Sequence, residues 1–308
     1  MKCERAIIAK IYAILLFVTP FANAKNFQFI AIGDTSYISS SQLDQLVDRI
    51  NRQSIRFTIH VGDIKSGSTL CSDEMFARVY SQFMAFDKPL IYTPGDNEWT
   101  DCHRKNNGPY DPIDRLQKIR GQFFSSDQSL GRQSLTLEQQ SAQAAFRGFP
   151  ENRRWSVENI SFATIHMVGS NNNDQPELPS SSEFKLRNEA NIAWMKETFA
   201  IARKQNNKAI VFAMQADTFY DPSKPLESGF VDWMAVFQQE MSSWKNPVLL
   251  IQGDSHVFKV DRPLEGKGAG LDLVQRLVVP GAQQTDAVVI EVDPENPTQI
   301  FTVRLLLH

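Results

Sequence analysis

Apolar and polar positions follow the same order of elements three times in the first half of the chain. Each time, an apolar run of strand length leads to a Gly-Asp pair, then to a loop and a stretch with helical spacing of apolar residues. The apolar runs cover residues 27–32, 57–61 and 90–93, and the pairs after them are Gly33-Asp34, Gly62-Asp63 and Gly95-Asp96. This alternation is typical of an α/β protein, in which loops at the strand C-termini carry the functional residues.

The helices of the first half have recognisable starts. They are predicted over residues 43–50, over residues 72–86 and from residue 112 onward. Ser41 with Asp44 is placed to cap the first of them. Asp111 is placed to cap the third, and Pro112 suits the first helical position.

The second half returns to β character and then alternates again. The predicted elements are a hairpin over 155–168 that turns at Asn159, a helix over 183–205, a strand over 209–214, a helix over 230–244, a strand over 248–251, and β-rich stretches at 257–260, 273–279 and 287–303. Residues 125–154 are rich in Gln and Ser, and we interpret them as an insertion over the surface. We therefore predict one α/β domain, residues 25–308, in which a two-sheet β-sandwich is flanked by helices.

The first 24 residues have the pattern of a secretory signal peptide. A positively charged start precedes the apolar run 11–21, and Ala22-Asn23-Ala24 forms a small-x-small cleavage site. A buried N-terminal helix is the alternative. Cleavage would leave Lys25 as the first residue and would place the protein in the periplasm or outside the cell. The sequence has no further apolar stretch of membrane-spanning length.

Charge and cysteine content agree with export. Residues 1–24 carry three basic residues and one acidic residue, a net +2, so the chain's charge of −3 becomes −5 when they are removed. This balance argues against binding of nucleic acid by bulk charge. Cys71 and Cys102 then remain, and we predict a disulfide between them, worth roughly 3–4 kcal/mol in the chain-entropy model. Two unpaired buried thiols are the alternative.

The candidate chemistry lies just beyond the predicted strand ends. The stretches are Gly33-Asp34-Thr35-Ser36, Gly62-Asp63, Gly95-Asp96-Asn97-Glu98, Met214-Gln215 and Gly253-Asp254-Ser255-His256. A glycine before the acid allows a sharp turn and a close backbone approach. Carboxylates that converge on one pocket raise each other's pKa, and bound divalent cations remove that conflict.

In the order of these motifs and their attachment to strand ends, the chain resembles the calcineurin-like metallophosphoesterases from Asp34 to His256. That family typically has Gly-Asp-x-His, Gly-Asp, Gly-Asn-His-Asp/Glu, a lone His and Gly-His-x-His. Asp34, Asp63 and His256 match residue types that bind metal in the family, and Asp63 would be the bridging carboxylate.

The sequence departs from the family pattern at five positions. Ser36, Asp96, Asn97, Gln215 and Asp254 stand where the family has His, Asn, His, His and His. The resemblance implies two divalent ions, one near Asp34, Asp63 and His256 and another near Asp63, Asp96, Gln215 and Asp254. Because oxygen donors replace imidazoles, we expect Mn²⁺, Mg²⁺ or Ca²⁺ rather than Zn²⁺.

The activity implied by the resemblance is hydrolysis of a small phosphate mono- or diester through a metal-bridging hydroxide. Asn97 replaces the usual phosphate-contacting His, and we predict that His103 assists the leaving group. Arg104 and Lys65 are candidate phosphate-binding residues, with solvated loop charge as the alternative for all three basic side chains. The sequence leaves the oligomeric state open.

Two other functions are possible for such a chain. A non-catalytic binding protein would keep this scaffold with one Ca²⁺ or no metal, and the absence of the usual histidines at Ser36, Asn97, Gln215 and Asp254 leaves this alternative open. A serine hydrolase that uses Ser255 and His256 is disfavoured, because these residues are adjacent and no Gly-x-Ser-x-Gly motif surrounds the serine.

Overall fold

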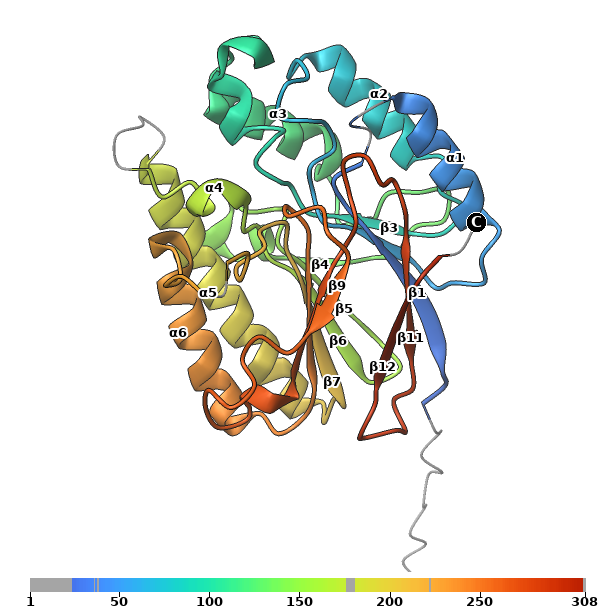
Figure 1. Cartoon of the computed structure of the whole chain (residues 1–308), viewed down its shortest axis with the longest axis vertical. Coiled ribbons are helices and arrows are strands. Elements are labelled where there is room, and N and C mark those ends of the chain that lie inside the picture. The colour runs from blue at the N-terminus through green and yellow to red at the C-terminus, as the bar shows by residue number, and fades with distance from the viewer. Residues whose placement is uncertain (1–23, 36, 38, 176–180, 222, 307–308) are drawn as a thin grey trace, which may run out of the picture.

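Two β-sheets lie face to face in the computed structural model, which describes residues 24–35, 37, 39–175, 181–221 and 223–306 (Figure 1). The first sheet has the order β12-β11-β1-β2-β3, and the second has the order β4-β5-β6-β7-β8-β10-β9. The strands of the first sheet are β1 (Phe27–Ile32), β2 (Thr58–His60), β3 (Leu90–Tyr92), β11 (Val288–Val292) and β12 (Phe301–Leu305). Those of the second are β4 (Glu138–Gln139), β5 (Arg153–Val157), β6 (Ile160–Thr164), β7 (Ala209–Ala213), β8 (Val248–Gln252), β9 (Lys259–Asp261) and β10 (Val274–Val278).

Helices cover the outer face of each sheet, which makes four layers (Figure 1). On the five-stranded sheet lie α1 (Ser40–Asn51), α2 (Asp73–Phe83) and α3 (Pro112–Phe123), and on the seven-stranded sheet lie α5 (Ser181–Lys204) and α6 (Ser228–Ser243). A short element, α4 (Gly169–Asn172), follows β6. The predicted two-sheet α/β sandwich flanked by helices is confirmed.

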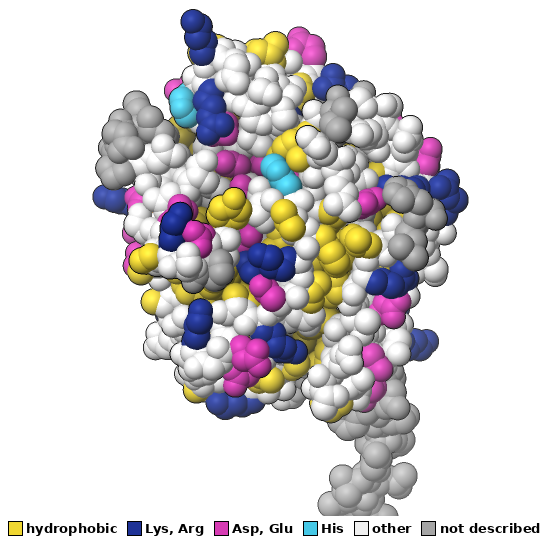
Figure 2. All heavy atoms as spheres, in the orientation of Figure 1, with side chains coloured by type: hydrophobic (Ala, Val, Ile, Leu, Met, Phe, Trp, Pro, Cys, Tyr) yellow, Lys and Arg dark blue, Asp and Glu magenta, His cyan; other side chains and the backbone are white. Residues whose placement is uncertain are grey.

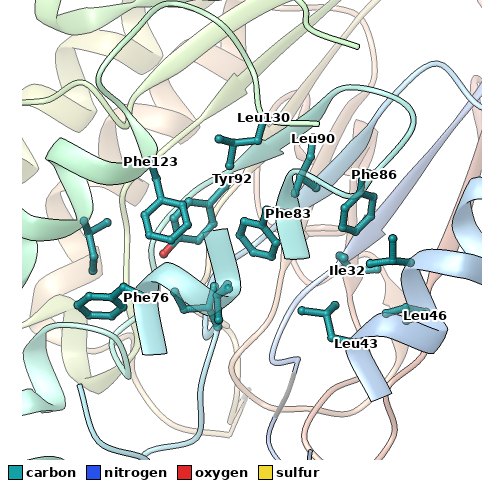
Figure 3. Close-up of a cluster of buried hydrophobic side chains, with 14 of the residues drawn as sticks. Ile32, Leu43, Leu46, Phe76, Phe83, Phe86, Leu90, Tyr92, Phe123 and Leu130 are labelled. Carbon is teal, nitrogen blue, oxygen red and sulfur yellow. The ribbon is translucent and has the colours of Figure 1, made fainter. Parts of the chain in front are cut away.

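Three apolar clusters hold these layers together. The cluster under α1–α3 contains Phe83, Tyr92 and Phe123, whose rings lie 5.3–6.0 Å apart (Figure 3). Between the sheets, the rings of Phe29, Phe57 and Phe162 pack at 5.1–5.4 Å. The third cluster lies under α5 and α6. Burial of apolar side chains on both faces explains why the central strands β1, β7 and β8 are almost continuously apolar.

Local signals in the sequence are confirmed at several elements and wrong at one. The hairpin turns at Glu158-Asn159, both with positive φ, as a tight two-residue hairpin turn requires. Asp111 caps α3 by accepting from the backbone N–H groups of Ile113 and Asp114. The predicted cap at Ser41 is wrong: α1 begins at Ser40 without a side-chain cap, since the Ser41 and Ser39 hydroxyls bond to each other at 2.9 Å.

Residues 125–154, the expected insertion, contain β4 and two short 3₁₀ turns, η3 (Gln140–Ala142) and η4 (Ala144–Phe146). Leu130 within it is buried and forms a bridge with Leu90 of β3. The predicted signal peptide lies outside the described residues, apart from Ala24. Among the described helices, none is both long and apolar enough to cross a membrane.

Parallel strands bring the functional loops to one edge of the molecule. In the first sheet β1, β2 and β3 are parallel neighbours, and in the second β6, β7 and β8 are parallel neighbours. Loops from the C-terminal ends of both sets contact one another: for example, the Gly253 N–H donates to the Gln215 carbonyl, and the Asp254 N–H donates to Asp34. The candidate residues therefore meet where the two sheets share this edge.

Candidate metal centre

Asp34, Asp63 and His256 form a compact group of metal-ligand atoms. One ligand atom from each residue lies within 4.8 Å of the others, and His256 Nε2 is 3.2 Å from Asp34 Oδ1. Both carboxylates are buried, whereas the His256 side chain is about one-third exposed. Across the described part of the chain, no other three His, Cys, Asp or Glu donors lie as close together. The structure thus assembles the three residues that match the family's metal ligands.

Glycines make this crowding possible. A Cβ atom at Gly253 would lie 2.6 Å from Asp34 Oδ2, and one at Gly95 would lie 2.1 Å from Asp63 Oδ1. The expected close approach is therefore confirmed at these glycines. The sharp turn, however, lies mostly on the residue after the glycine, because Asp34, Asp63 and Asp254 have φ values of 51°, 54° and 68°. Non-glycine residues in this region are uncommon and concentrate at functional sites.

Asp63 receives hydrogen bonds from two neighbouring side chains. Tyr37 Oη donates to Asp63 Oδ2 at 2.7 Å, and Asn97 Nδ2 lies 2.6 Å from the same oxygen. The Asn97 backbone N–H also donates to Asp63 Oδ1 at 3.2 Å. The Tyr37 ring packs edge-on against His256 at 5.3 Å. Sequence reasoning missed Tyr37, whose signal was a hydroxyl three residues after Asp34 in the first loop.

Asp96 and Gln215, two predicted ligands of the second ion, are in direct contact. Gln215 Nε2 donates to Asp96 Oδ1 at 3.1 Å, while Gln215 Oε1 accepts from the Gly169 N–H at 2.5 Å. Ser170 Oγ donates to the other Asp96 oxygen at 2.8 Å. Gln215 therefore presents its amide nitrogen to Asp96, and it would offer oxygen to a cation only by turning its amide over and losing the Gly169 bond.

Asp254 contacts Asp34 through its backbone and extends its side chain toward Asp96. Its N–H lies 3.2 Å from both oxygens of Asp34, while its carboxylate lies against Gly169, where an added Cβ would be 2.8 Å from Oδ1. Asp254 thus supports Asp34 with its main chain and carries its charge toward the Asp96 side of the centre.

Buried negative charge dominates the electrostatics. Burial raises the pKa of Asp63 well above its ordinary value, and the nearby carboxylates of Asp96 and Glu98 raise it further. Burial and the charge of Asp96 act in the same direction on the pKa of Asp254. The pKa of Asp34 is also raised by burial, although its hydrogen bond to His256 opposes the shift. Divalent cations would relieve this repulsion, so the donor set fits metal.

A left-handed turn supplies Ser170 to this centre. Ser170, Asn171, Asn172 and Asn173 all have φ between 53° and 57°, an arrangement that costs roughly 1–2 kcal/mol per residue for L-amino acids. Buried Arg187 holds the turn by donating to the Asn172 side-chain oxygen at 2.5 Å and to its carbonyl at 2.9 Å. Neither this strain nor the role of Ser170 was predicted from the sequence.

The Cys71–Cys102 disulfide is confirmed, with a Cα–Cα distance of 5.8 Å. The two sulfur atoms lie 3.7 and 3.8 Å from the carbonyl oxygen of Asn97. The bridge therefore packs directly against the loop that carries Asp96 and Asn97.

The remaining predicted residues lie around this disulfide. His103 is exposed, and its Nδ1 lies 2.6 Å from the Thr100 carbonyl oxygen. Arg104 pairs with buried Asp101, and burial raises the pKa of that carboxyl to about 7. A Cβ at Gly67 would lie 3.5 Å from Arg104 Nη1 and 2.9 Å from Asn97 Oδ1, which places the guanidinium beside Asn97.

Lys65 and Glu98 lie behind the centre. Lys65 is buried, and its Nζ donates to the Ser66 carbonyl at 2.9 Å. Burial lowers the pKa of Lys65, while the charges of Glu98 and Asp63 oppose that shift. Buried Glu98, to which the sequence assigned no role, accepts from the Gly95 N–H and from Tyr92 Oη, both at 2.7 Å. It thereby fixes the loop between β3 and Asp96. Ser36 lies outside the described residues.

His256 brings the centre to the surface, since about one-third of its side chain is exposed. Figure 2 shows acidic side chains beside a histidine in the upper middle of one face, with a band of apolar side chains below them. The centre is therefore accessible from solvent although most of its carboxylates are buried.

Two solved structures share this architecture. The chain is similar to a dimetal phosphatase from Danio rerio, with a TM-score of 0.56 and 11% identity over 91% of this chain and 99% of that one. It is also similar to the structure of PhoD, with a TM-score of 0.57 and 11% identity over 93% of this chain and 70% of that one. No protein-family model and no curated protein matches the sequence. The motif order and this likeness of fold together show that the chain has the calcineurin-like metallophosphoesterase fold.

Proposed function

We propose that this protein is an exported, metal-dependent phosphoesterase that hydrolyses a small phosphate mono- or diester. The observation that carries the proposal is the convergence of Asp34, Asp63 and His256 with Asp96 and Asp254 at the shared edge of the two sheets. Buried carboxylates with raised pKa values are costly in a folded protein unless cations or protons compensate them.

The chain offers positions for two divalent ions. Asp34, Asp63 and His256 would hold one, and Asp63, Asp96, Asp254 and, after its amide turns over, Gln215 would hold the other. Such ions would supply Lewis-acid charge for the phosphate oxygens and activate water for the attack on phosphorus. The oxygen-rich donor set favours Mn²⁺, Mg²⁺ or Ca²⁺ over Zn²⁺.

The protein's own side chains would bind and orient the phosphate. Asn97 is fixed by its bonds to Asp63 and by the disulfide behind its carbonyl, so its position is set before substrate arrives. Arg104 lies beside it and carries donors suited to phosphate oxygens. Buried Lys65 would act on the carboxylates as a counter-charge, in addition to the phosphate-binding role that its sequence position indicates.

His103 remains our candidate for protonation of the leaving group. Because the Thr100 carbonyl only accepts hydrogen bonds, Nδ1 of His103 carries the proton of that contact. Nε2 is therefore the atom that would gain and release a proton. If this role holds, His103→Ala should slow hydrolysis of alkyl phosphates more than that of activated aryl phosphates, and an equal loss on both would contradict it.

A non-catalytic binding protein is the second candidate, and a specific observation favours it. Gln215 turns its amide nitrogen toward Asp96 and its oxygen toward the Gly169 N–H, so it presents no donor oxygen to a second ion. Export is supported by the predicted signal peptide and by the disulfide, since disulfides persist in oxidising compartments.

One experiment separates the two candidates. The protein without residues 1–24 would be stripped of metal, reloaded with Mn²⁺, Mg²⁺, Ca²⁺ or Zn²⁺ in turn, and assayed on activated phosphate mono- and diesters. Metal-dependent turnover, greatest with a hard ion, is expected. Absence of turnover with every ion would favour the binding protein.

A further inference from the structure

We infer that the cavity beside Asp254 binds the alcohol part of the substrate and that this part carries an aromatic ring. The inference rests on the proposed function, because it concerns the group esterified to the phosphate. The cavity has a volume of about 410 Å³, within the range of small-molecule sites. Gly169, Ser170 and Asp254 are among its lining residues, so the cavity adjoins the candidate metal centre.

Part of the cavity wall is apolar and includes aromatic rings. Phe230 and Met234 lie one turn apart on α6, each with only 4% of its surface exposed, and Leu264 is also buried. Phe219 and Leu226 are partly buried and pack on the same cluster. Flat rings gain from contacts with phenylalanine and methionine beyond the area that they bury. These walls therefore favour an aromatic group over a short polar alcohol.

One wall is held in place by a buried ion pair. Arg276 lies with its guanidinium carbon 5.5 Å from the centre of the Phe219 ring, and its Nη1 contacts Asp217 Oδ1 at 2.6 Å. The same Asp217 oxygen accepts from the Phe219 N–H at 3.2 Å. Phe219 is thus fixed from both sides, and the wall needs little ordering when a ligand arrives.

The opposite wall is the left-handed turn docked on the start of α6. Asn171 Oδ1 accepts from the Gly229 N–H at 2.8 Å, and Asn171 Nδ2 donates to Ser228 Oγ at 3.1 Å. A Cβ at Gly229 would lie 2.1 Å from the Asn171 carbonyl oxygen, so the contact is close along the backbone. The turn that presents Ser170 to Asp96 therefore also shapes the cavity.

Charges at the rim do not favour a second phosphate group. Lys224 pairs with Asp221 at 3.1 Å, and Lys267 and Glu227 add one charge of each sign. The lining has no net positive charge beyond the metal centre. We therefore expect one phosphate at the centre and a neutral aromatic group of one or two rings in the cavity.

The test compares non-hydrolysable ligands that differ only in this group. Benzylphosphonate and methylphosphonate would be titrated into the Mn²⁺-loaded protein by calorimetry. Burial of the ring predicts that benzylphosphonate binds roughly tenfold to a hundredfold more tightly. Equal affinities, or no binding by either ligand, would overturn the inference.

Two leucine variants test whether the cavity causes the preference for benzylphosphonate. Leu226→Trp would fill the cavity from a partly exposed position and should remove the preference for benzylphosphonate. Leu273→Trp makes the same change at a partly buried leucine of the same cluster outside the cavity, and it should keep the preference. A preference that survives Leu226→Trp in a folded variant would place the ring elsewhere and contradict the inference.

Kinetics distinguish this inference from the proposed function. Benzyl phosphate and ethyl phosphate are both esters of primary alcohols, and benzyl phosphate should have the higher kcat/KM. Equal values would overturn the cavity assignment while the phosphoesterase stands. Preferential binding of benzylphosphonate without turnover of either ester would support the cavity as a ligand site and contradict the proposed catalysis.

Discussion

The two halves of the candidate metal centre are built differently. Around Asp34, Asp63 and His256, three donors lie within 4.8 Å of one another, held by backbone turns with positive φ and by glycines that admit them. Around Asp96, by contrast, Gln215 presents its amide nitrogen, which donates to Asp96 and cannot bind a cation.

This difference shows that a metal site can change its side-chain donors while its backbone geometry is kept. Backbone geometry in the first half leaves the carboxylates little freedom, so the half is ready for an ion. In the second half the side chain of Gln215 must turn over before it offers oxygen, and that costs its bond to the Gly169 N–H. We therefore infer a first ion that binds tightly and a second that binds weakly.

The largest expected effect comes from Asp63, which both halves share. Asp63→Ala should lower turnover by at least about a thousandfold, because it removes the carboxylate common to both ions. Since burial and neighbouring carboxylates raise its pKa, removing it should leave the metal-free protein as stable as before or more stable. Turnover and thermal unfolding in chelator measure the two effects. Retained turnover would show that Asp63 is not the bridging ligand.

The disulfide should have the next largest effect, on stability. It joins residues 31 apart in the sequence, and replacing both Cys71 and Cys102 by Ala should cost about 3–4 kcal/mol in the free energy of unfolding. Denaturant unfolding with and without reductant measures this cost. Because the sulfur atoms pack against Asn97, we also expect weaker phosphate binding. A double variant with unchanged stability would contradict the structural role of the bridge.

Gln215→Glu changes only the half of the centre around Asp96 and Gln215. Glutamate keeps an acceptor for the Gly169 N–H and replaces the amide nitrogen that faces Asp96 with oxygen. The second ion should then bind about tenfold more tightly, as expected for an added carboxylate ligand. Gln215→Met, similar in size but without a strong donor, is the matched control and should weaken the second ion. Equal Mn²⁺ affinities in all three proteins would rule out a role for this position.

The smallest expected effect is a dependence of metal stabilisation on pH. Asp63 and Asp254 have folded-state pKa values above those of the unfolded chain. In their protonated form, these carboxyls contribute to the stability of the metal-free protein below about pH 4. This contribution is lost as the pH rises through their folded-state pKa values. Bound Mn²⁺ removes the repulsion between the ionised carboxylates, so the rise in Tm that Mn²⁺ causes should grow between pH 5 and pH 8. Each kcal/mol gained in the free energy of unfolding should raise Tm by roughly 2–4 °C.

His60 provides an internal control for that experiment. Its ring nitrogens contact the uncharged Thr35 hydroxyl and Gly62 N–H, and burial lowers its pKa to about 3. The unfolded chain takes up a proton there below about pH 6.5, so stability falls toward acid with or without Mn²⁺. The difference between metal-loaded and metal-free protein cancels this contribution. A metal effect that does not change with pH would contradict the repulsion between the carboxylates.

The parts of the fold that depend on local pattern were predictable from the sequence. Apolar runs placed the strands, the Gly-Asp pairs placed the functional loops at strand ends, and Asn159 marked the hairpin turn. The disulfide followed from the two cysteines that remain when the predicted signal peptide is removed. These features depend on residues close in sequence or on simple counting.

The unpredicted parts depend on tertiary packing. The left-handed turn at Ser170 is held by Arg187 of α5, 15 residues beyond Asn172. Asparagine tolerates positive φ, so the run Asn171–Asn173 permits this turn but does not identify the residue that holds it. The orientation of the Gln215 amide is decided by the Gly169 N–H on another loop. Tyr37 reaches Asp63 only because β1 and β2 are neighbours. Side-chain direction in a crowded centre is set by partners that pattern alone does not identify.

A Mn²⁺ titration of the metal-free protein tests whether the two halves of the centre differ in their affinity for the ion. Electron paramagnetic resonance would report binding, and turnover of an activated phosphate ester would be measured in the same samples. We predict two ions that bind in sequence, with affinities at least about tenfold apart and turnover that rises with the second. Two ions of equal affinity would contradict the difference between the two halves. Turnover that is complete in chelator would contradict a metal centre altogether.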